Sequence, residues 1–178
     1  LTINCTADTQ QTQPSTKSPP ELDDSKAAKE SLSNILFSKA NGQITAQERL
    51  EIANQISDLE VAEDGKSIIA CEREANAEIE VIDLNKDGVQ EVFVIGGNLC
   101  TSGNTGRTLW LFIKDAAGVY RMNFGFPAIG YRIQESKNLG FPDLMFGGPG
   151  FCFPIWRWNG KSYSFLKKHA DLPGACDR

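Results

Sequence analysis

The chain has little of what most catalytic and metal-cluster sites need. Its 178 residues include one histidine, His169, and five cysteines that form neither a CxxC pair nor a Cys/His cluster, so a zinc site is not expected. It has no G-x-S-x-G elbow, no H-E-x-x-H helix and no Walker loop. No nucleophile stands at a recognisable spacing from His169, which favours a surface or packing role for this residue. We therefore expect a binding protein and not an enzyme.

Basic clusters and long apolar runs are also missing. The net charge is -5, and no group of lysines and arginines is dense enough to follow a phosphate backbone, which argues against nucleic-acid binding. No apolar run approaches the roughly 20 residues that span a bilayer. The chain does not start with a charged and then apolar signal segment. If the protein is exported, we expect that its signal peptide has already been removed from this numbering.

The cysteines are spread along the chain and predict disulfides. Cys71, Cys100, Cys152 and Cys176 can form two bonds, with three connectivities that the sequence does not rank. Disulfides persist in oxidising compartments, so we expect an exported protein of the periplasm or the outer membrane. Cys5 heads a polar tail, where a bacterial lipoprotein carries its acylated cysteine. The preceding "LTIN" lacks the usual small residue, so a lipid anchor and a free thiol remain alternatives.

The composition divides the chain into a tail and one domain. Residues 1–22 are rich in Thr, Gln, Ser and Pro, which predicts a disordered tether. Residues 23–178 are expected to form a single β-rich, calcium-binding domain with a helical flank at 23–58. Apolar residues at helical spacing, followed by a capping box formed by Thr45 and Glu48, predict two short helices in this flank.

From residue 59 the apolar pattern has a period of two. It predicts short strands at 77–82, 91–95, 107–113, 119–123, 129–133, 143–147 and 154–158, with breaks that include "FGFP" at 124–127. Asn159-Gly160 predicts a tight hairpin, because both turn positions must accept positive φ. Short strands without helices between them favour a mainly β fold of antiparallel sheets. The body is expected to be propeller-like or sandwich-like.

The stretch "IDLNKDGVQEVFVIGG", residues 82–97, has the pattern of a calcium loop. Calcium prefers six to eight hard oxygen ligands, and acidic residues at alternate positions of a short loop converge on one point. Carboxylates this close would raise one another's pKa in the absence of a cation. A solvated acidic turn is the alternative interpretation. The predicted ligands are Asp83, Asn85, Asp87, the Val89 carbonyl and Glu91, with Gly88 allowing the bend.

The spacing of this loop is not that of an EF-hand. The twelfth position, where an EF-hand has its bidentate Glu, is Val94, and a β run follows the loop. "DLNKDGVQEVFV" instead resembles the calcium loops of FG-GAP and integrin-type propeller blades. The chain has one copy, whereas a propeller needs several. We expect calcium here to stabilise the fold and to perform no chemistry.

Two long glycine-containing loops are candidates for partner binding, since recognition often resides in loops on a rigid β scaffold. They are "NLCTSGNTG" at 98–106 and "FGGPGFCFP" at 146–154. We expect Cys100 and Cys152 to staple them together. The phenylalanines of the second loop are alternatively part of the core. The candidate contact residues are Ser102, Gly103, Asn104, Gly148, Pro149 and Phe151.

Taken together, "DLNKDGVQEVFV", the Cys-containing loop after it, "TLWLFI" and "WRWNGKSYSF" resemble a group of small exported bacterial proteins. The group includes periplasmic lysozyme inhibitors and immunity proteins against peptidoglycan hydrolases. The resemblance implies a calcium-binding inhibitor that inserts a loop into a hydrolase cleft. The alternative is a calcium-dependent carbohydrate-binding or adhesion module, in which Trp110, Trp156 and Trp158 stack on sugar rings. Alternatively, Trp156 and Trp158 share one sheet face and pack in the core.

Overall fold

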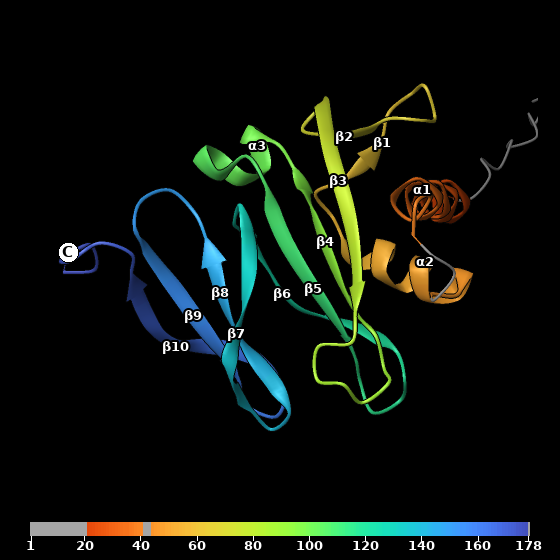
Figure 1. Ribbon diagram of the computed structural model, residues 1–178. Coiled ribbons are helices and arrows are strands. Elements are labelled where there is room, and N and C mark those ends of the chain that lie inside the picture. Colours follow the sequence, from red (N-terminus) through yellow and green to blue (C-terminus); the bar gives the residue numbers. More distant parts are fainter. Residues whose placement is uncertain (1–20, 41–43, 178) are drawn as a thin grey trace, which may run out of the picture.

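The computed structural model describes residues 21–40 and 44–177 (Figure 1). Two helices come first, α1 (Glu21–Leu36) and α2 (Ala46–Gln55), and ten strands follow. The two predicted helices are thus present in the flank. The predicted tether lies outside the described residues except for its last two positions, which belong to α1. Cys5, the candidate for lipidation, also lies outside them.

The strands form two antiparallel sheets, and in each sheet they follow one another in sequence order. The prediction of a mainly β fold with antiparallel sheets is confirmed, and the body is of the sandwich-like kind (Figure 1). The first sheet contains β1 (Glu60–Val61), β2 (Ile68–Ala70), β3 (Arg73–Ile82), β4 (Glu91–Gly97), β5 (Thr108–Lys114) and β6 (Tyr120–Pro127). The second contains β7 (Gly130–Asn138), β8 (Phe141–Gly147), β9 (Cys152–Trp158) and β10 (Tyr163–Ala170).

Apolar cores lie on both faces of the first sheet. Val92, Val94 and Trp110 belong to a core shared with α1 and α2. Phe93 and Leu109 belong to a core shared with the second sheet. Neighbours on a strand point to opposite faces, so the continuous apolar runs of β4 and β5 reflect a sheet that is covered on both sides. In Figure 1 the helices flank one side of this sheet and the second sheet lies on the other.

α2 is fixed at both of its ends. The predicted capping box is confirmed, because the Thr45 side chain accepts a hydrogen bond from the Glu48 backbone N–H and Glu48 reaches back to the Thr45 N–H. At the other end, Gln55 pairs with the outer edge of β6. Its Nε2 donates to the Tyr120 carbonyl (2.8 Å), and its Oε1 accepts from the Met122 N–H (2.8 Å). Gln55 thus bonds this edge as a neighbouring strand would.

Two of the predicted turns differ in the structure. "FGFP" was predicted as a break but lies inside β6, where Gly125 lets the Trp110 indole approach the backbone. A Cβ at position 125 would stand 2.5 Å from Trp110 Cδ1. Asn159 and Gly160 do join β9 to β10, but only Gly160 has a positive φ. Asn159 Oδ1 accepts hydrogen bonds from the N–H groups of Lys161 and Ser162, so the connection is a longer turn organised by the Asn side chain.

All four cysteines predicted to form disulfides do so, in the pairs Cys71–Cys100 and Cys152–Cys176. The expected staple between Cys100 and Cys152 is therefore wrong. The β2–β3 turn brings Cys71 to Cys100, and Asn98 Nδ2 holds that turn by donating to the Ala70 carbonyl (2.9 Å). Cys152, at the start of β9, instead ties down the C-terminal segment. Two disulfides are typical of a protein from an oxidising environment.

Candidate functional site

The β3–β4 loop, residues 83–90, folds its polar side chains back onto its own backbone. Asp83 accepts hydrogen bonds from the N–H groups of Asp87 (3.1 Å) and Gly88 (2.9 Å). Asn85 Oδ1 accepts from the same Asp87 N–H (3.1 Å). Asp87 Oδ1 accepts from the Val89 N–H (2.8 Å). The side-chain oxygens of three predicted ligands therefore gather around one short piece of backbone, and the positive φ of Gly88, 88°, provides the predicted bend.

Glu91, the predicted closing ligand, is the buried member of this set. Its residue is 1% exposed, and its Oε2 accepts a hydrogen bond from the Leu84 N–H (2.7 Å). Burial raises the pKa of the Glu91 carboxyl to about 7, and the negative charges of Asp87 and Asp83 contribute to the increase. No cation of the chain forms an ion pair with Glu91 within the described residues. The predicted ligand atoms of the loop are all oxygens, and their side chains carry an excess of negative charge, which suits a hard divalent cation.

The five predicted ligands all lie between the end of β3 and the start of β4, but they do not form a complete shell of carboxylates. Within residues 21–40 and 44–177, no three His, Cys, Asp or Glu side chains come together as a metal site would require. The predicted shell includes the Asn85 amide and the Val89 carbonyl, and Glu91 is bonded to the start of the loop. Calcium binding by these residues stays a prediction.

The two long loops meet at one end of the sandwich. The first folds into α3 (Leu99–Ser102) and a 3₁₀ turn, η1 (Gly103–Thr105), and the second joins β8 to β9. Both lie at the upper end of the sheets in Figure 1, opposite the β3–β4 loop. A cavity of about 390 Å³ has walls from both: Thr105 from the first, and Gly148 and Pro149 from the second. We call this region, with its cavity, the loop end.

The predicted contact residues at the loop end fall into two groups. Ser102 is buried, and its hydroxyl shares a hydrogen bond with Thr108 (2.8 Å), so it cannot contact a partner as expected and instead fixes α3 to β5. The remaining candidates are not buried, and the Phe151 residue is 56% exposed. The other candidates are Gly103, Asn104, Gly148 and Pro149.

The cavity has an aromatic lining, and its member Phe126 was missed from the sequence. Phe126, Phe146 and Trp156 contribute to its walls and pack on one another, with ring centroids 4.8 to 5.6 Å apart. Phe126 belongs to "FGFP", which the sequence predicts to be a break. The alternation in "NFGFP", residues 123–127, was the available signal, since it places Phe124 and Phe126 on one face of a strand.

The three tryptophans have mainly structural positions. Trp110 and Trp158 are buried in the two different cores. Trp156 lies on the same face as Trp158, as the packing alternative predicted, and it is partly exposed toward the loop end. His169 is on the surface, 3.2 Å from the Asp171 carboxylate.

One charged cluster is structural. Asp143 is fully buried in β8 and accepts two hydrogen bonds from Arg157 (2.8 and 2.7 Å) and one from Ser136 (2.6 Å). The Arg157 guanidinium holds the pKa of Asp143 below its usual value, and the Ser136 hydroxyl adds to this effect. All its partners come from neighbouring strands of the second sheet, and the cluster does not line the cavity of the loop end.

Among the helices of the described residues, none has the length and apolarity needed to cross a membrane. The chain matches no family model, no curated protein and no solved structure. The similarity to calcium-loop proteins and lysozyme inhibitors therefore stays a prediction.

Proposed function

We propose that this chain is an exported calcium-binding protein that binds and inhibits a partner protein of the lysozyme-like peptidoglycan hydrolase class. Partner binding is carried by one observation: both glycine-containing loops lie at the loop end and share an aromatic cavity. Cavities with apolar walls and few polar groups are the usual binding sites of proteins. The exposed Phe151 ring beside it provides an aromatic side chain of the kind that anchors interfaces.

The disulfides support this role although they do not join the two loops to each other. Cys71–Cys100 fixes α3 to the β2–β3 turn, and Cys152–Cys176 fixes the second loop where β9 starts. Each loop is thus anchored on the scaffold separately. Preorganised loops lose less entropy on binding. The net charge of -5 favours encounter with a basic partner, as many lysozyme-type enzymes are.

Inhibition can be tested with a panel of lysozymes and secreted muramidases in the presence of calcium. We expect the wild-type protein to inhibit at least one enzyme and the Phe151→Ala variant to be at least tenfold weaker. Leu139→Ala is the matched control, because Leu139 is also exposed (68%) but lies in the β7–β8 turn, at the other end of the sheets (Figure 1). Absence of complex and inhibition across the panel would remove this part of the proposal.

Calcium is proposed to bind in the β3–β4 loop through Asp83, Asn85 and Asp87, with the Val89 carbonyl and Glu91 completing the shell. Its role is to offset the negative charge of the loop and fix the β3–β4 connection. A ligand at a hundredfold its dissociation constant stabilises a protein by about 2.7 kcal/mol. We therefore expect EDTA to lower the melting temperature of the wild-type protein.

Two variants make the calcium test specific. Asp87→Ala should abolish the difference between melting curves in calcium and in EDTA. Asp64→Ala is the matched control, because Asp64 also accepts backbone hydrogen bonds in a tight turn, from Lys66 and Ser67, but lies outside the loop. It should lower stability equally in both buffers. Identical wild-type curves with and without calcium would exclude the site.

A carbohydrate-binding module is the second candidate, favoured by the partial exposure of Trp156 in the aromatic cavity. An indole face at the mouth of a cavity can stack on a sugar ring. A glycan array separates the two candidates: glycan binding that Trp156→Ala abolishes would favour the module, whereas hydrolase inhibition without glycan binding favours the inhibitor.

A further inference from the structure

The outer edge of β3 is open along most of its length. β2 pairs only with Arg73–Ala75, because Ser67 already belongs to the turn that bonds back to Ala62. β3 continues to Ile82 with β4 on its other side. Among the described residues, no strand and no hydrogen bond reaches the backbone on the outer side of residues 77–82. An unpaired edge of this kind is a template for a further strand.

The other edge of the same sheet shows that the chain does cover an edge elsewhere. At β6, the side chain of Gln55 in α2 donates to the Tyr120 carbonyl and accepts from the Met122 N–H, so it occupies the backbone groups that a further strand would use. Nothing comparable is present along β3 in the described part of the chain. The open edge is therefore a local feature of β3, and we call residues 77–82 the β3 edge.

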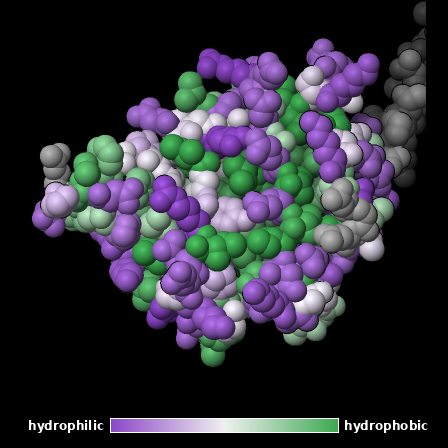
Figure 2. All heavy atoms as spheres, in the orientation of Figure 1, coloured by the Kyte–Doolittle hydropathy of each residue, from purple (hydrophilic) through white to green (hydrophobic). Residues whose placement is uncertain are grey.

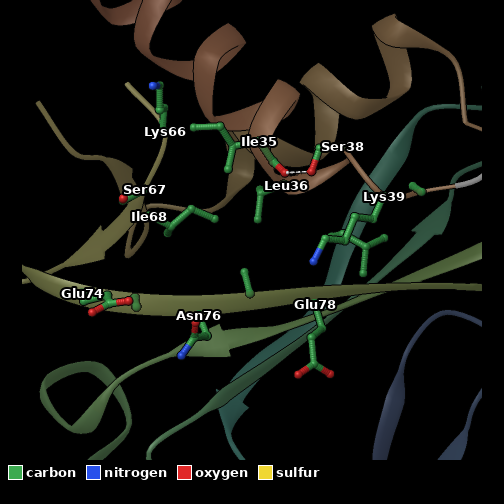
Figure 3. Close-up of a pocket in the computed structure, with 14 residues that line it drawn as sticks. Ile35, Leu36, Ser38, Lys39, Lys66, Ser67, Ile68, Glu74, Asn76 and Glu78 are labelled. Carbon is green, nitrogen blue, oxygen red and sulfur yellow. Dashed lines mark hydrogen bonds between the residues drawn. The ribbon is translucent and has the colours of Figure 1, made fainter. Parts of the chain in front are cut away.

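A cavity of about 560 Å³ lies beside the β3 edge, between β3, the end of α1 and the β1–β2 turn (Figure 3). The cavity lies where β2 would run beside β3 if β2 were longer. Side chains from both faces of β3 line it, for example Ala77 and Ile79 from one face and Asn76 from the other. Because residues from both faces of β3 line the cavity, the cavity lies against the edge of the strand and not against one face of the sheet. Figure 2 shows apolar atoms on this side of the molecule between β3 and α1.

The two sides of the β3 edge differ in chemistry. On the helix side, Leu36 of α1 points toward β3 (Figure 3), and Ile35 of α1 and Ile68 of β2 also line the cavity. On the opposite side β3 exposes a row of acidic side chains, and Figure 3 shows Glu78 pointing away from the helix. The row consists of Glu74, Glu78 and Glu80.

The acidic row is only partly neutralised. Arg107 forms an ion pair with Glu78, but Arg107 is only half-buried and Glu78 is exposed, and ion pairs in contact with solvent contribute little. Neither Glu74 nor Glu80 has an ion-pair partner among the residues that the structure describes. Lys39, by contrast, lines the cavity on the helix side, as does Lys66. Basic side chains of an added strand are therefore favoured on the acidic side and disfavoured on the helix side.

We propose that the β3 edge binds an extended segment of a partner protein in which apolar and basic residues alternate. The segment pairs with β3 through backbone hydrogen bonds and extends the first sheet. Because successive side chains of a strand point to opposite faces, its apolar residues enter the cavity and its basic residues face the acidic row. This surface is distinct from the loop end and does not depend on the function proposed for it.

Charge argues for this partner over two other occupants. Antiparallel pairing with the β3 edge of a second copy would place the acidic rows of both copies on facing strands, and like charges across strands are destabilising. Residues 1–20 of the same chain contain a single basic residue, Lys17, and cannot supply the alternation. A segment with alternating basic and apolar residues matches both the acidic side and the apolar side of the β3 edge.

A labelled seven-residue peptide with alternating Lys and Val, starting and ending with Lys, tests the proposal on the full chain. Fluorescence anisotropy at physiological salt measures binding, and amide hydrogen exchange locates it. We expect the peptide to bind and to slow exchange in residues 77–82. A peptide of the same composition with its lysines first and its valines last should bind at least tenfold more weakly, because it has the charge without the alternation.

Charge reversal provides the second arm. The double variant Glu78→Lys and Glu80→Lys should bind the alternating Lys-Val peptide at least tenfold more weakly than wild type does. It should also bind an alternating Glu-Val peptide, which the wild-type protein should not. The matched control is Glu135→Lys with Asp177→Lys, which makes the same change in net charge at exposed positions outside the β3 edge. The affinity of this control variant for the Lys-Val peptide should stay within about twofold of the wild-type affinity. Melting temperatures of both variants establish that they are folded.

Several results would overturn the proposal. Equal binding of both lysine peptides without protection of residues 77–82 would mean simple charge attraction. In the free protein, residues 77–82 could instead become more protected from hydrogen exchange as the protein concentration rises. Together with a dimer seen by light scattering, this result would assign the edge to a second copy. Protection of the free monomer that disappears when residues 1–20 are removed would assign it to the chain's own tail.

Discussion

The buried carboxyl of Glu91 gives the most direct test of the electrostatics of the β3–β4 loop. In the folded chain burial holds its pKa at about 7, whereas the ordinary value is 4.5. Between these two pH values the folded state keeps a proton that the unfolded state has released. The free energy of unfolding therefore decreases as the pH rises through this window.

The size of the effect follows from the shift. Each pKa unit corresponds to about 1.4 kcal/mol, so the ionised Glu91 costs the folded, calcium-free protein on the order of 3 kcal/mol above pH 7. Glu91→Gln removes the charge and keeps an acceptor for the Leu84 N–H. In EDTA we expect the variant to be more stable than wild type at pH 8 by about this amount, and equal to wild type below pH 4.

Urea denaturation of both proteins at several pH values in EDTA measures this difference. Subtracting the two curves removes the contribution of titrating groups that do not interact with Glu91. With calcium the order should reverse at pH 8, because the wild-type carboxylate then faces a cation and the Gln variant has lost a ligand. A difference that is independent of pH in EDTA would refute the argument from burial.

Three further substitutions test the scaffold. Replacing Cys71 and Cys100 together by Ser should lower the free energy of unfolding by about 3 to 4 kcal/mol, because the bond closes a loop with a sequence separation of 29; urea denaturation checks this. Arg157→Met leaves buried Asp143 unpaired and should cost about 3 to 5 kcal/mol at pH 7, with a smaller loss in acid when measured by pH-dependent denaturation. Gly125→Ala clashes with an indole and should cost about 1 to 3 kcal/mol, measured by thermal unfolding.

Local patterns predicted the elements well where the chain is half-buried or capped. The alternation of "AEIEVI" predicted the second half of β3, and Thr45 with Glu48 predicted the start of α2. These signals are contained in a few neighbouring residues. The prediction of a break at "FGFP" was wrong because Gly125 does not form a turn. It lets Trp110, a residue of another strand, pack closely against the backbone of β6. Tertiary packing there outweighs the preference of Gly and Pro for turns.

Contacts between segments that are distant in the chain could not be predicted from local sequence patterns. Cys71 and Cys100 meet because the β2–β3 turn reaches α3, and three connectivities were equally allowed by the spacing. The ion pair of Asp143 with Arg157 depends on the register of β8 against β9 in the same way. The open β3 edge also depends on how short β2 is, which its apolar residues do not reveal. The sequence identified the candidate loops but not the aromatic cavity between them.

If calcium binds in the β3–β4 loop as proposed, the position of this loop limits the effect of the ion on partner binding. This loop and the loop end lie at opposite ends of the sheets (Figure 1), with the two apolar cores between them. If calcium acts only by stabilising the fold, its removal should lower the melting temperature and leave the affinity of the loop end unchanged, within about twofold, at a temperature where the apo protein is fully folded. Isothermal titration of the inhibited hydrolase in calcium and in EDTA measures this, and Asp87→Ala in calcium should match wild type in EDTA. A large loss of affinity in a fully folded apo protein would mean that the partner contacts the calcium loop, or that the ion changes the loop end through the strands.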